Sequence, residues 1–156
     1  KTFNIAGIHT GNVIISNTKL ATIFERKMKS LGLGPNALGI HLATAGYSEG
    51  AANWLDSLLT YLAENFRIFN SGIDKIPGCK AMPAEGTYLA WVDFSGTGMS
   101  REEFTSRIEK SAKITTVHGS EMGKGGETYM RFNIATPKSR VIEAVERMQK
   151  AFKDLQ

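Results

Sequence analysis

The chain has 156 residues, of which 42% are hydrophobic and 22% are charged, so it has the composition of an ordinary globular protein and enough length to bury a core. Its formal net charge of +4 could favour nucleic acid, but the lysines and arginines are scattered and do not gather with aromatic residues. No apolar stretch approaches the ~18 residues of a membrane span. We therefore expect neither a nucleic-acid partner nor a membrane partner.

The chain has one cysteine, Cys79, which excludes an internal disulfide and a cysteine-based metal site. This cysteine usage is typical of the reducing cytoplasm. The three histidines, His9, His41 and His118, do not stand at the spacing of metal ligands. The sequence therefore predicts a cytoplasmic protein without a metal site.

The first third of the chain predicts one strand and two helices. The β-branched run at residues 11–16 is bounded by turn formers and predicts a buried strand. Asn17 is a typical N-cap, and the apolar residues behind it repeat at helical spacing until Gly32. A second helix is predicted over residues 36–47, although the two glycines that it contains weaken the pattern.

The rest of the chain predicts a longer helix and then a small mixed domain. Residues 50–73 carry the longest helical pattern, which predicts a helix able to brace two domains. The strands expected after it are 79–82, 87–94, 114–117 and 129–135, and the helices expected are 100–112 and 137–155. Residues 87–94 are apolar on both faces, which predicts burial between two layers. This order of elements predicts a compact α+β layer pair.

Two residues could carry chemistry, Lys1 and Arg131. An unprotonated lysine amine adds to an aldehyde, and the arginine fork binds a carboxylate through two parallel hydrogen bonds. Taken without further context, Lys1 is a solvated terminal residue and Arg131, beside apolar strand residues, is an internal ion-pair partner.

Four segments change this interpretation by their joint order and spacing. They are Lys-Thr-Phe-Asn-Ile-Ala-Gly at 1–7, Gly-Ala-Ala-Asn-Trp-Leu-Asp at 50–56, Pro-Ala-Glu-Gly-Thr-Tyr-Leu-Ala-Trp at 83–91, and Arg-Phe-Asn at 131–133 with Pro137 behind it. Together they resemble the C-terminal part of fold-type I pyridoxal-phosphate enzymes of the class I/II aminotransferase family, in its MalY/PatB-like cystathionine β-lyase branch. The resemblance covers essentially the whole chain.

The resemblance implies a fold that passes from α/β to α+β. Residues 1–48 would be the end of a large cofactor-binding domain, and residues 49–156 would be a connecting helix and a small α+β domain. The chain would then be the C-terminal portion of a longer enzyme that forms a homodimer. The remaining cofactor contacts of the family lie before the lysine and are not among these residues.

The resemblance also implies roles for individual residues. Lys1 would form a Schiff base with pyridoxal 5′-phosphate and move the Cα proton, and Arg131 would hold the α-carboxylate of an amino-acid substrate. Many relatives have a phosphate-binding arginine eight positions after the lysine, where this chain has His9. His9 is therefore either a substitute phosphate contact or an ordinary, partly buried histidine.

The glycine-rich loop at residues 118–127 misses the spacing of a P-loop. Its glycines predict a mobile connection that turns sharply, and the resemblance implies that it leads into Arg131 at the mouth of an active site.

Three functions remain open on the sequence. The branch implies a carbon–sulfur β-lyase that converts cystathionine or cysteine-type amino acids to pyruvate, ammonia and a thiol. A class I/II aminotransferase shares Lys1 and Arg131 and is the alternative. A non-catalytic α+β binding or interaction domain, of ferredoxin-like type, is the third. As an isolated fragment the chain is expected to be inactive.

Overall fold

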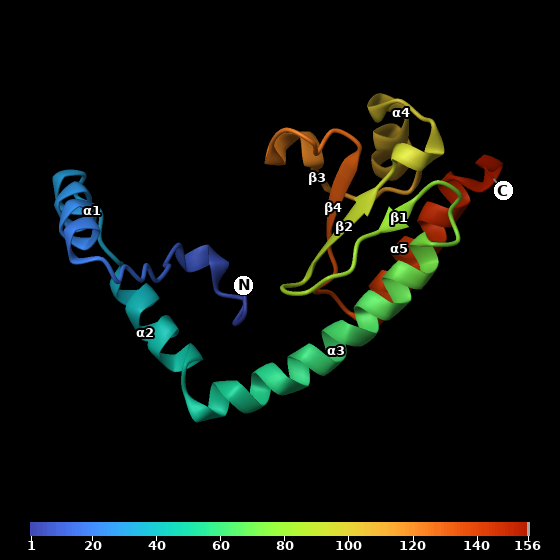
Figure 1. The fold of residues 1–156 in the computed structure, drawn as a ribbon. Coiled ribbons are helices and arrows are strands. Elements are labelled where there is room, and N and C mark those ends of the chain that lie inside the picture. Colours follow the sequence, from blue (N-terminus) through green and yellow to red (C-terminus); the bar gives the residue numbers. More distant parts are fainter. Residues whose placement is uncertain (156) are drawn as a thin grey trace. The chain divides into compact units, whose positions relative to one another are not determined.

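The computed structural model describes residues 1–155, and the chain divides into two compact units (Figure 1). The first unit comprises Lys1–Ser57, and the second begins at Leu58. The boundary falls inside the long helix α3 (Glu49–Ile73), which contributes residues to both units. The division predicted at residue 48, between a large-domain remnant and a small domain, stays a prediction.

The first unit contains α1 (Thr18–Ser30), α2 (Ala37–Gly46) and the beginning of α3. Asparagine side chains begin the first two helices, because the Oδ1 atoms of Asn17 and Asn36 accept hydrogen bonds from amides one turn further on, at 3.1 Å and 2.7 Å. Both helices predicted in this part of the chain are therefore confirmed.

The strand predicted at residues 11–16 is wrong, because these residues form no strand in the structure. Val13 is 64% exposed and Ile14 is 95% exposed. A β-branched run becomes a strand only when a neighbouring strand pairs with it and buries its side chains. Residues 1–57, all of which the structure describes, contain no strand that could do so.

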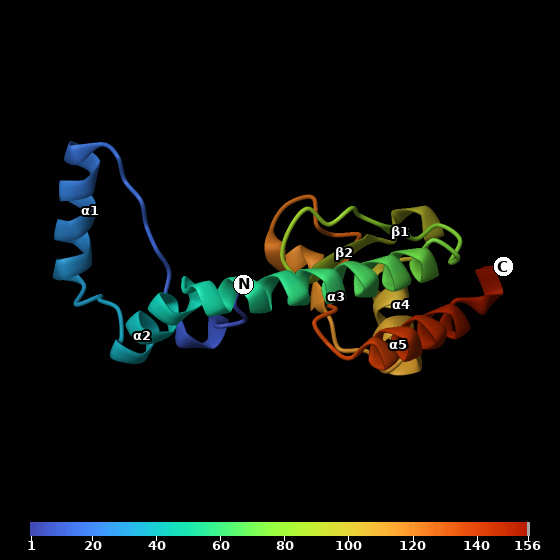
Figure 2. The same ribbon diagram turned by 90° about the horizontal axis from the view of Figure 1, so that it is seen from below.

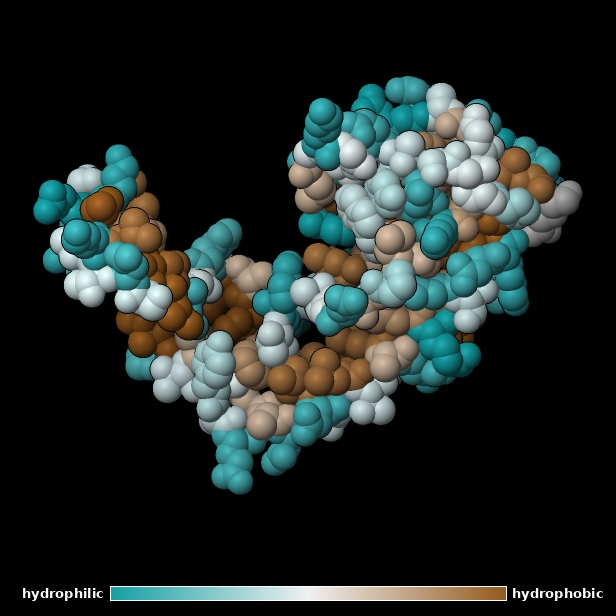
Figure 3. Space-filling model, viewed as in Figure 1, coloured by the Kyte–Doolittle hydropathy of each residue, from teal (hydrophilic) through white to brown (hydrophobic). Residues whose placement is uncertain are grey.

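The first unit also has no hydrophobic core of its own. The buried hydrophobic residues of the described chain all lie in the second unit, from Leu62 onward. Large apolar side chains of the first unit are instead exposed, and Figure 3 shows them in brown over α1 and α2. The exposed residues include Leu20, Ile23, Leu31, Leu33, Leu38 and Ile40. Packing within residues 1–57 therefore depends on local contacts rather than on a core.

The second unit is built on a four-stranded antiparallel sheet with strand order β1-β2-β4-β3 (Figure 1). The strands are β1 (Lys80–Ala81), β2 (Leu89–Asp93), β3 (Val117–His118) and β4 (Tyr129–Asn133). All are shorter than their predicted ranges, and β3 begins only at the last residue of its range. The amide of Ile114 donates to the carbonyl of Ile108, so this part of the chain still closes the preceding helix.

One face of the sheet packs against three helices. These are the second half of α3, α4 (Arg101–Ser106), which continues into a π-helical turn at Arg107–Ser111, and α5 (Lys138–Ala151). Helix α5 lies beside the second half of α3 (Figure 2), where the Gln149 side chain donates to the carbonyl of Gly72 at 2.9 Å. The predicted α+β layer pair is therefore confirmed.

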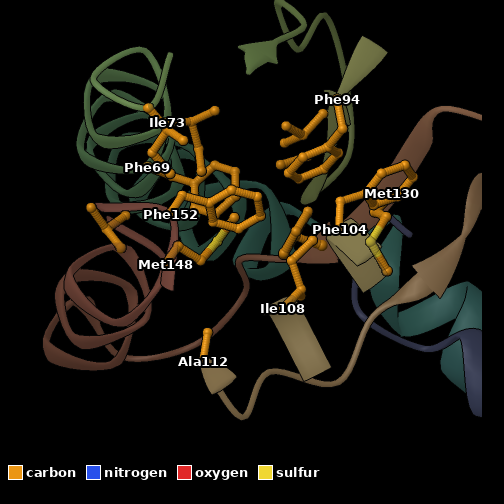
Figure 4. Packing of buried hydrophobic residues seen from close by; sticks show 14 of the residues in the cluster. Phe69, Ile73, Phe94, Phe104, Ile108, Ala112, Met130, Met148 and Phe152 are labelled. Carbon is orange, nitrogen blue, oxygen red and sulfur yellow. The ribbon is translucent and has the colours of Figure 1, made fainter. Parts of the chain in front are cut away.

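Aromatic rings fill the middle of this core (Figure 4). Phe94 is fully buried and stacks on Phe104, with ring centroids 5.0 Å apart, and lies 6.0 Å from Phe152. On the sheet, buried positions alternate with half-buried ones along β2, and along β4 as far as its last residue, Asn133, which is exposed. Full burial of β2 on both faces, as its sequence predicts, is therefore not reached within the described residues.

Asn65 of α3 fixes the connection between the sheet and α5. Its side chain is completely buried, and its Nδ2 donates to the carbonyls of Ile134 and Thr136 at 3.0 Å and 2.9 Å. Two donors of one buried amide thus hold the end of β4 and the approach to α5.

No helix among residues 1–155 is both long and apolar enough to cross a membrane.

The Cys79 thiol gives a pH-dependent test of this fold. Burial raises the pKa of the Cys79 thiol to about 12, well above its usual range, and the negative charge of Asp93 acts in the same direction. At pH 8 the native protein therefore holds about a thousandfold less thiolate at Cys79 than the unfolded chain does. We expect native alkylation by iodoacetamide to keep rising about tenfold per pH unit beyond pH 9.

The control is the same reaction in denaturant, where the rate should level off above about pH 9 because the thiol is then fully ionised. A native rate that levelled off at the same pH would contradict the burial of Cys79.

Candidate functional site

The segment that carries Lys1 is seated on helix α2. The Phe3 ring packs against Gly46 and meets Tyr47 edge-on, with ring centroids 5.7 Å apart and planes at 72°. A Cβ atom at Gly46 would lie 2.9 Å from Cδ2 of Phe3, closer than carbon atoms pack. Because Gly46 has no side chain, the ring of Phe3, two residues from Lys1, can pack directly against the backbone of α2.

A second glycine of α2 receives the end of the same segment. A Cβ atom at Gly39 would overlap the side chain of Thr10. The carbonyl of Ile8 accepts hydrogen bonds from Asn36 Nδ2 at 2.8 Å and from the Thr10 hydroxyl at 3.2 Å. Gly39 and Gly46 stand seven residues apart, about two helical turns, and so lie on one side of α2. These glycines, which weaken the helical pattern in the sequence, are packing positions.

Lys1 borders a small pocket of about 130 Å³. The pocket is lined entirely by residues of the first unit, which are Lys1, Thr2, Phe3, Ile5, Thr10, Asn12, Ala43 and Tyr47. An amine there stands beside hydroxyl groups and a carboxamide, which can donate hydrogen bonds to an anionic or carbonyl-bearing ligand.

His9 borders a different pocket, of about 440 Å³, which includes Met28 and Pro35 in its lining. It has a left-handed backbone with φ at 49°, and it is not among the residues that line the pocket beside Lys1. The structure thus does not bring His9 to that pocket, and a phosphate contact by His9 stays a prediction.

Arg131 stands in the middle of the sheet of the second unit. It pairs with Trp91 on β2 and with Val117 on β3. Its neighbours in sequence, Met130 and Phe132, are buried in the core, so Arg131 is on the opposite face because side chains alternate along a strand.

An aromatic stack borders Arg131 on that opposite face. The rings of Trp91 and Tyr129 lie nearly parallel, with centroids 5.2 Å apart and planes at 10°. Tyr129 and Arg131 stand two residues apart on β4, and both are half-buried. The arginine is therefore held on a flat, partly apolar surface rather than on a flexible loop.

Arg131 has no carboxylate partner among the residues that the structure describes. None of the ion pairs within residues 1–155 includes it. The hydrogen bond that its side chain makes there runs from Nη1 to the sulfur of Met122, at 3.6 Å. The interpretation of Arg131 as an internal ion-pair partner is therefore wrong for this part of the protein.

The glycine-rich loop at residues 118–127 is held by a close backbone contact. Gly119 and Gly126 approach so closely that a Cβ atom on either would overlap the backbone of the other. Between them, Gly119–Met122 form a short 3₁₀ helix, and Gly123 and Gly125 take positive φ angles of 123° and 92°. Two of the glycines thus turn the chain, as expected, and two allow the close approach.

Three features of this site are not apparent in the sequence. They are the contact of Met122 with Arg131, the Trp91–Tyr129 stack, and a hydrogen bond of 2.8 Å between Nε2 of His118 and Oε1 of Glu109. The spacing of Tyr129 and Arg131 was the one sequence signal for these contacts, since residues two apart share a face of a strand.

No group of His, Cys, Asp or Glu that could hold a metal ion occurs within residues 1–155.

Comparison with known proteins finds pyridoxal-phosphate enzymes. The chain is 33% identical over 153 residues to cystathionine beta-lyase PatB of Bacillus subtilis (strain 168). This match covers 97% of this chain and 39% of the relative. It is 27% identical to an aspartate aminotransferase of Pyrococcus horikoshii, over 97% of this chain and 39% of that one. Cystalysin from Treponema denticola, whose structure contains a pyridoxal 5′-phosphate cofactor, matches with a TM-score of 0.86 and 34% identity, over 99% of this chain and 40% of that chain.

The chain belongs to the class I/II aminotransferase-fold family of pyridoxal-phosphate enzymes. It corresponds to the C-terminal part of that fold and spans about two-fifths of the length of the relatives that it matches. Its helices and small antiparallel sheet match that part, which confirms the predicted fold class. No protein-family model matches the chain.

The residues around Lys1 fit one part of a pyridoxal-phosphate site of this family. The pocket offers an amine, as Schiff-base chemistry requires, with the polar side chains of Thr10, Asn12 and Tyr47 beside it. Lys1 and Arg131 belong to different units of the chain. The roles of Lys1 and Arg131 stay predictions.

Gly119→Ala tests the backbone contact that holds the loop beside Arg131. Its Cβ atom would overlap the carbonyl of Gly126 and lie 2.7 Å from the carbonyl oxygen of Tyr129 and 2.9 Å from Cη2 of Trp91. We expect the free energy of unfolding to fall by about 1–3 kcal/mol, as for an overpacked site. Denaturant unfolding, followed by tryptophan fluorescence, measures this change in the free energy of unfolding.

Gly86→Ala is the matched control. A Cβ atom there meets nothing within 4 Å, and its φ is not positive. This substitution should be neutral or should stabilise by about 0.4–1 kcal/mol, because it reduces the entropy of the unfolded chain. Equal effects of the two substitutions would mean that the Gly119–Gly126 contact is not required.

Proposed function

We propose that the protein containing this chain is a pyridoxal-phosphate-dependent carbon–sulfur β-lyase that acts on cystathionine and cysteine-type amino acids. Two observations support this proposal. The Arg131 guanidinium has no carboxylate partner within residues 1–155, and the chain aligns over 97% of its length with a cystathionine beta-lyase. An amino-acid substrate always offers the α-carboxylate that such a fork binds.

Pyridoxal phosphate, when bound, supplies an aldehyde that condenses with amines and a ring that stabilises negative charge at Cα. Lys1 is the amine that holds the cofactor before substrate arrives, and its ε-amino group then accepts the Cα proton as a general base. Phe3, seated on Gly46, keeps the segment of Lys1 in position for this transfer. The thiolate leaves from Cβ, and the aminoacrylate that is released hydrolyses to pyruvate and ammonia.

Arg131 orients the substrate in this scheme. Two of its three guanidinium nitrogens bind the two carboxylate oxygens, and this fixes the direction of the Cα–H bond. The stacked rings of Trp91 and Tyr129 on the same face limit the water around the guanidinium and so strengthen the pair. The complete protein is a homodimer in this proposal, and residues 1–156 alone are inactive.

An aminotransferase is the second candidate, because the chain also aligns over 97% of its length with an aspartate aminotransferase. Both reactions use the same lysine and arginine. They differ in whether a leaving group departs from Cβ of the substrate or the substrate amino group is transferred to a keto acid.

The product test separates the two candidates. With the complete protein and cystathionine or cysteine, we expect pyruvate and thiol release without an added keto acid. Lys1→Ala should abolish this release and also the adduct that borohydride reduction traps on Lys1, because no other amine stands in its position. Amino transfer that depends on a keto acid, with no pyruvate, would replace the lyase by the aminotransferase.

Arg131→Lys tests the carboxylate site. Lysine keeps the positive charge but cannot form the two parallel hydrogen bonds, so we expect KM for the amino acid to rise by about 10–100-fold while kcat changes less. Steady-state kinetics measure both constants.

Arg140→Lys is the control for this substitution. The Arg140 side chain is 70% exposed and pairs with Glu143 on the surface of α5 at 3.0 Å. Its replacement should leave KM within about twofold of the original, because exposed pairs contribute little. An Arg131 variant with an unchanged KM would exclude Arg131 as the carboxylate ligand.

A further inference from the structure

Met122 is the residue that meets the Arg131 guanidinium. Its sulfur lies 3.6 Å from Nη1 of Arg131, and the residue is 50% exposed. A thioether is a weak hydrogen-bond acceptor, and the methionine side chain turns easily about three bonds. The contact is therefore one that a stronger acceptor can displace.

The cross-strand neighbours of Arg131 offer the guanidinium no competing acceptor. Trp91 and Val117 stand directly opposite it on the two adjacent strands. An indole is a donor only, and a valine side chain has no polar atom. The one hydrogen bond that the Arg131 side chain makes within residues 1–155 is thus to a soft and weakly accepting atom.

The backbone that carries Met122 is fixed even though its side chain is exposed. Met122 ends the 3₁₀ helix Gly119–Met122, whose first residue packs against the backbone of Gly126 and under the Trp91 ring. The position of the thioether beside Arg131 is therefore set by the sheet, while its rotamer can change.

We propose that Met122 is a positioning residue for Arg131, which holds one guanidinium nitrogen loosely until the carboxylate of an amino-acid substrate displaces it. This inference rests on the proposed function of Arg131. A strong acceptor at position 122 would occupy Nη1 permanently and compete with substrate, whereas a weak acceptor keeps the fork oriented and available. The chemistry of residue 122 therefore sets the affinity of the site for carboxylates.

A graded series of substitutions tests this inference in the complete, cofactor-loaded protein. Met122→Leu removes the acceptor at similar volume, Met122→Gln supplies an amide oxygen, and Met122→Glu supplies a carboxylate. We expect KM to rise by about two- to fivefold for the leucine variant, because the guanidinium loses the contact that orients it, by about tenfold for the glutamine variant, and further still for the glutamate variant. The kcat values should stay within about threefold, because the competition affects binding and not the proton transfer.

Inhibition by propionate gives a second measurement that does not involve the reaction itself. Its inhibition constant should rise in the same order as KM, because propionate offers a carboxylate and no amine. Ile142→Gln is the control for a new glutamine, because Ile142 of α5 is 41% exposed. This substitution should change neither KM nor the inhibition constant of propionate.

The outcomes separate this inference from the proposed function. If Arg131→Lys raises KM but the leucine, glutamine and glutamate variants at position 122 share one KM, the role of Met122 is wrong and the carboxylate site stands. If Arg131→Lys leaves KM unchanged, the proposed carboxylate site itself fails. A graded rise in both constants, with unchanged unfolding midpoints, supports the inference.

Discussion

The pairing of β2 with β4 is the constraint on which the second unit depends. Five residues of each strand pair in register, from Leu89 opposite Asn133 to Asp93 opposite Tyr129. Because side chains alternate across a strand, this single register sends Met130 and Phe132 into the aromatic core and Arg131 to the other face. A shift by one residue would bury the arginine and expose the core. Stability and the candidate carboxylate site are therefore set by the same hydrogen bonds.

The two units achieve order by different means. The second unit buries a continuous core in which Phe94, Phe104 and Phe152 pack together (Figure 4). The first unit buries no large apolar side chain and depends on asparagine caps and on the fit of Phe3 and Thr10 against glycines of α2. The segment of Lys1 is thus ordered by local shape, whereas Arg131 is ordered by a packed sheet.

The helices could be predicted because their signals are local. An asparagine before an apolar repeat caps a helix whatever surrounds it, as Asn17 and Asn36 do. The strand predicted at residues 11–16 failed because strands need a partner that local sequence does not specify, and residues 1–57 supply none. Strand β3 is reduced to Val117 and His118 for a different reason, because the amide of Ile114 still donates to the carbonyl of Ile108 in the preceding helix.

The sequence by itself determined the family, the caps and spacing of the helices, and the two candidate residues Lys1 and Arg131, because ordered motifs and helical periodicity are properties of the chain alone. Only the tertiary structure decided that Arg131 lacks a carboxylate partner within residues 1–155, that Met122 meets its guanidinium, and that Gly39, Gly46, Gly119 and Gly126 are contact positions. These facts concern atoms of residues that are not neighbours in the chain. Their proximity follows from packing and strand register, which no short stretch of sequence encodes.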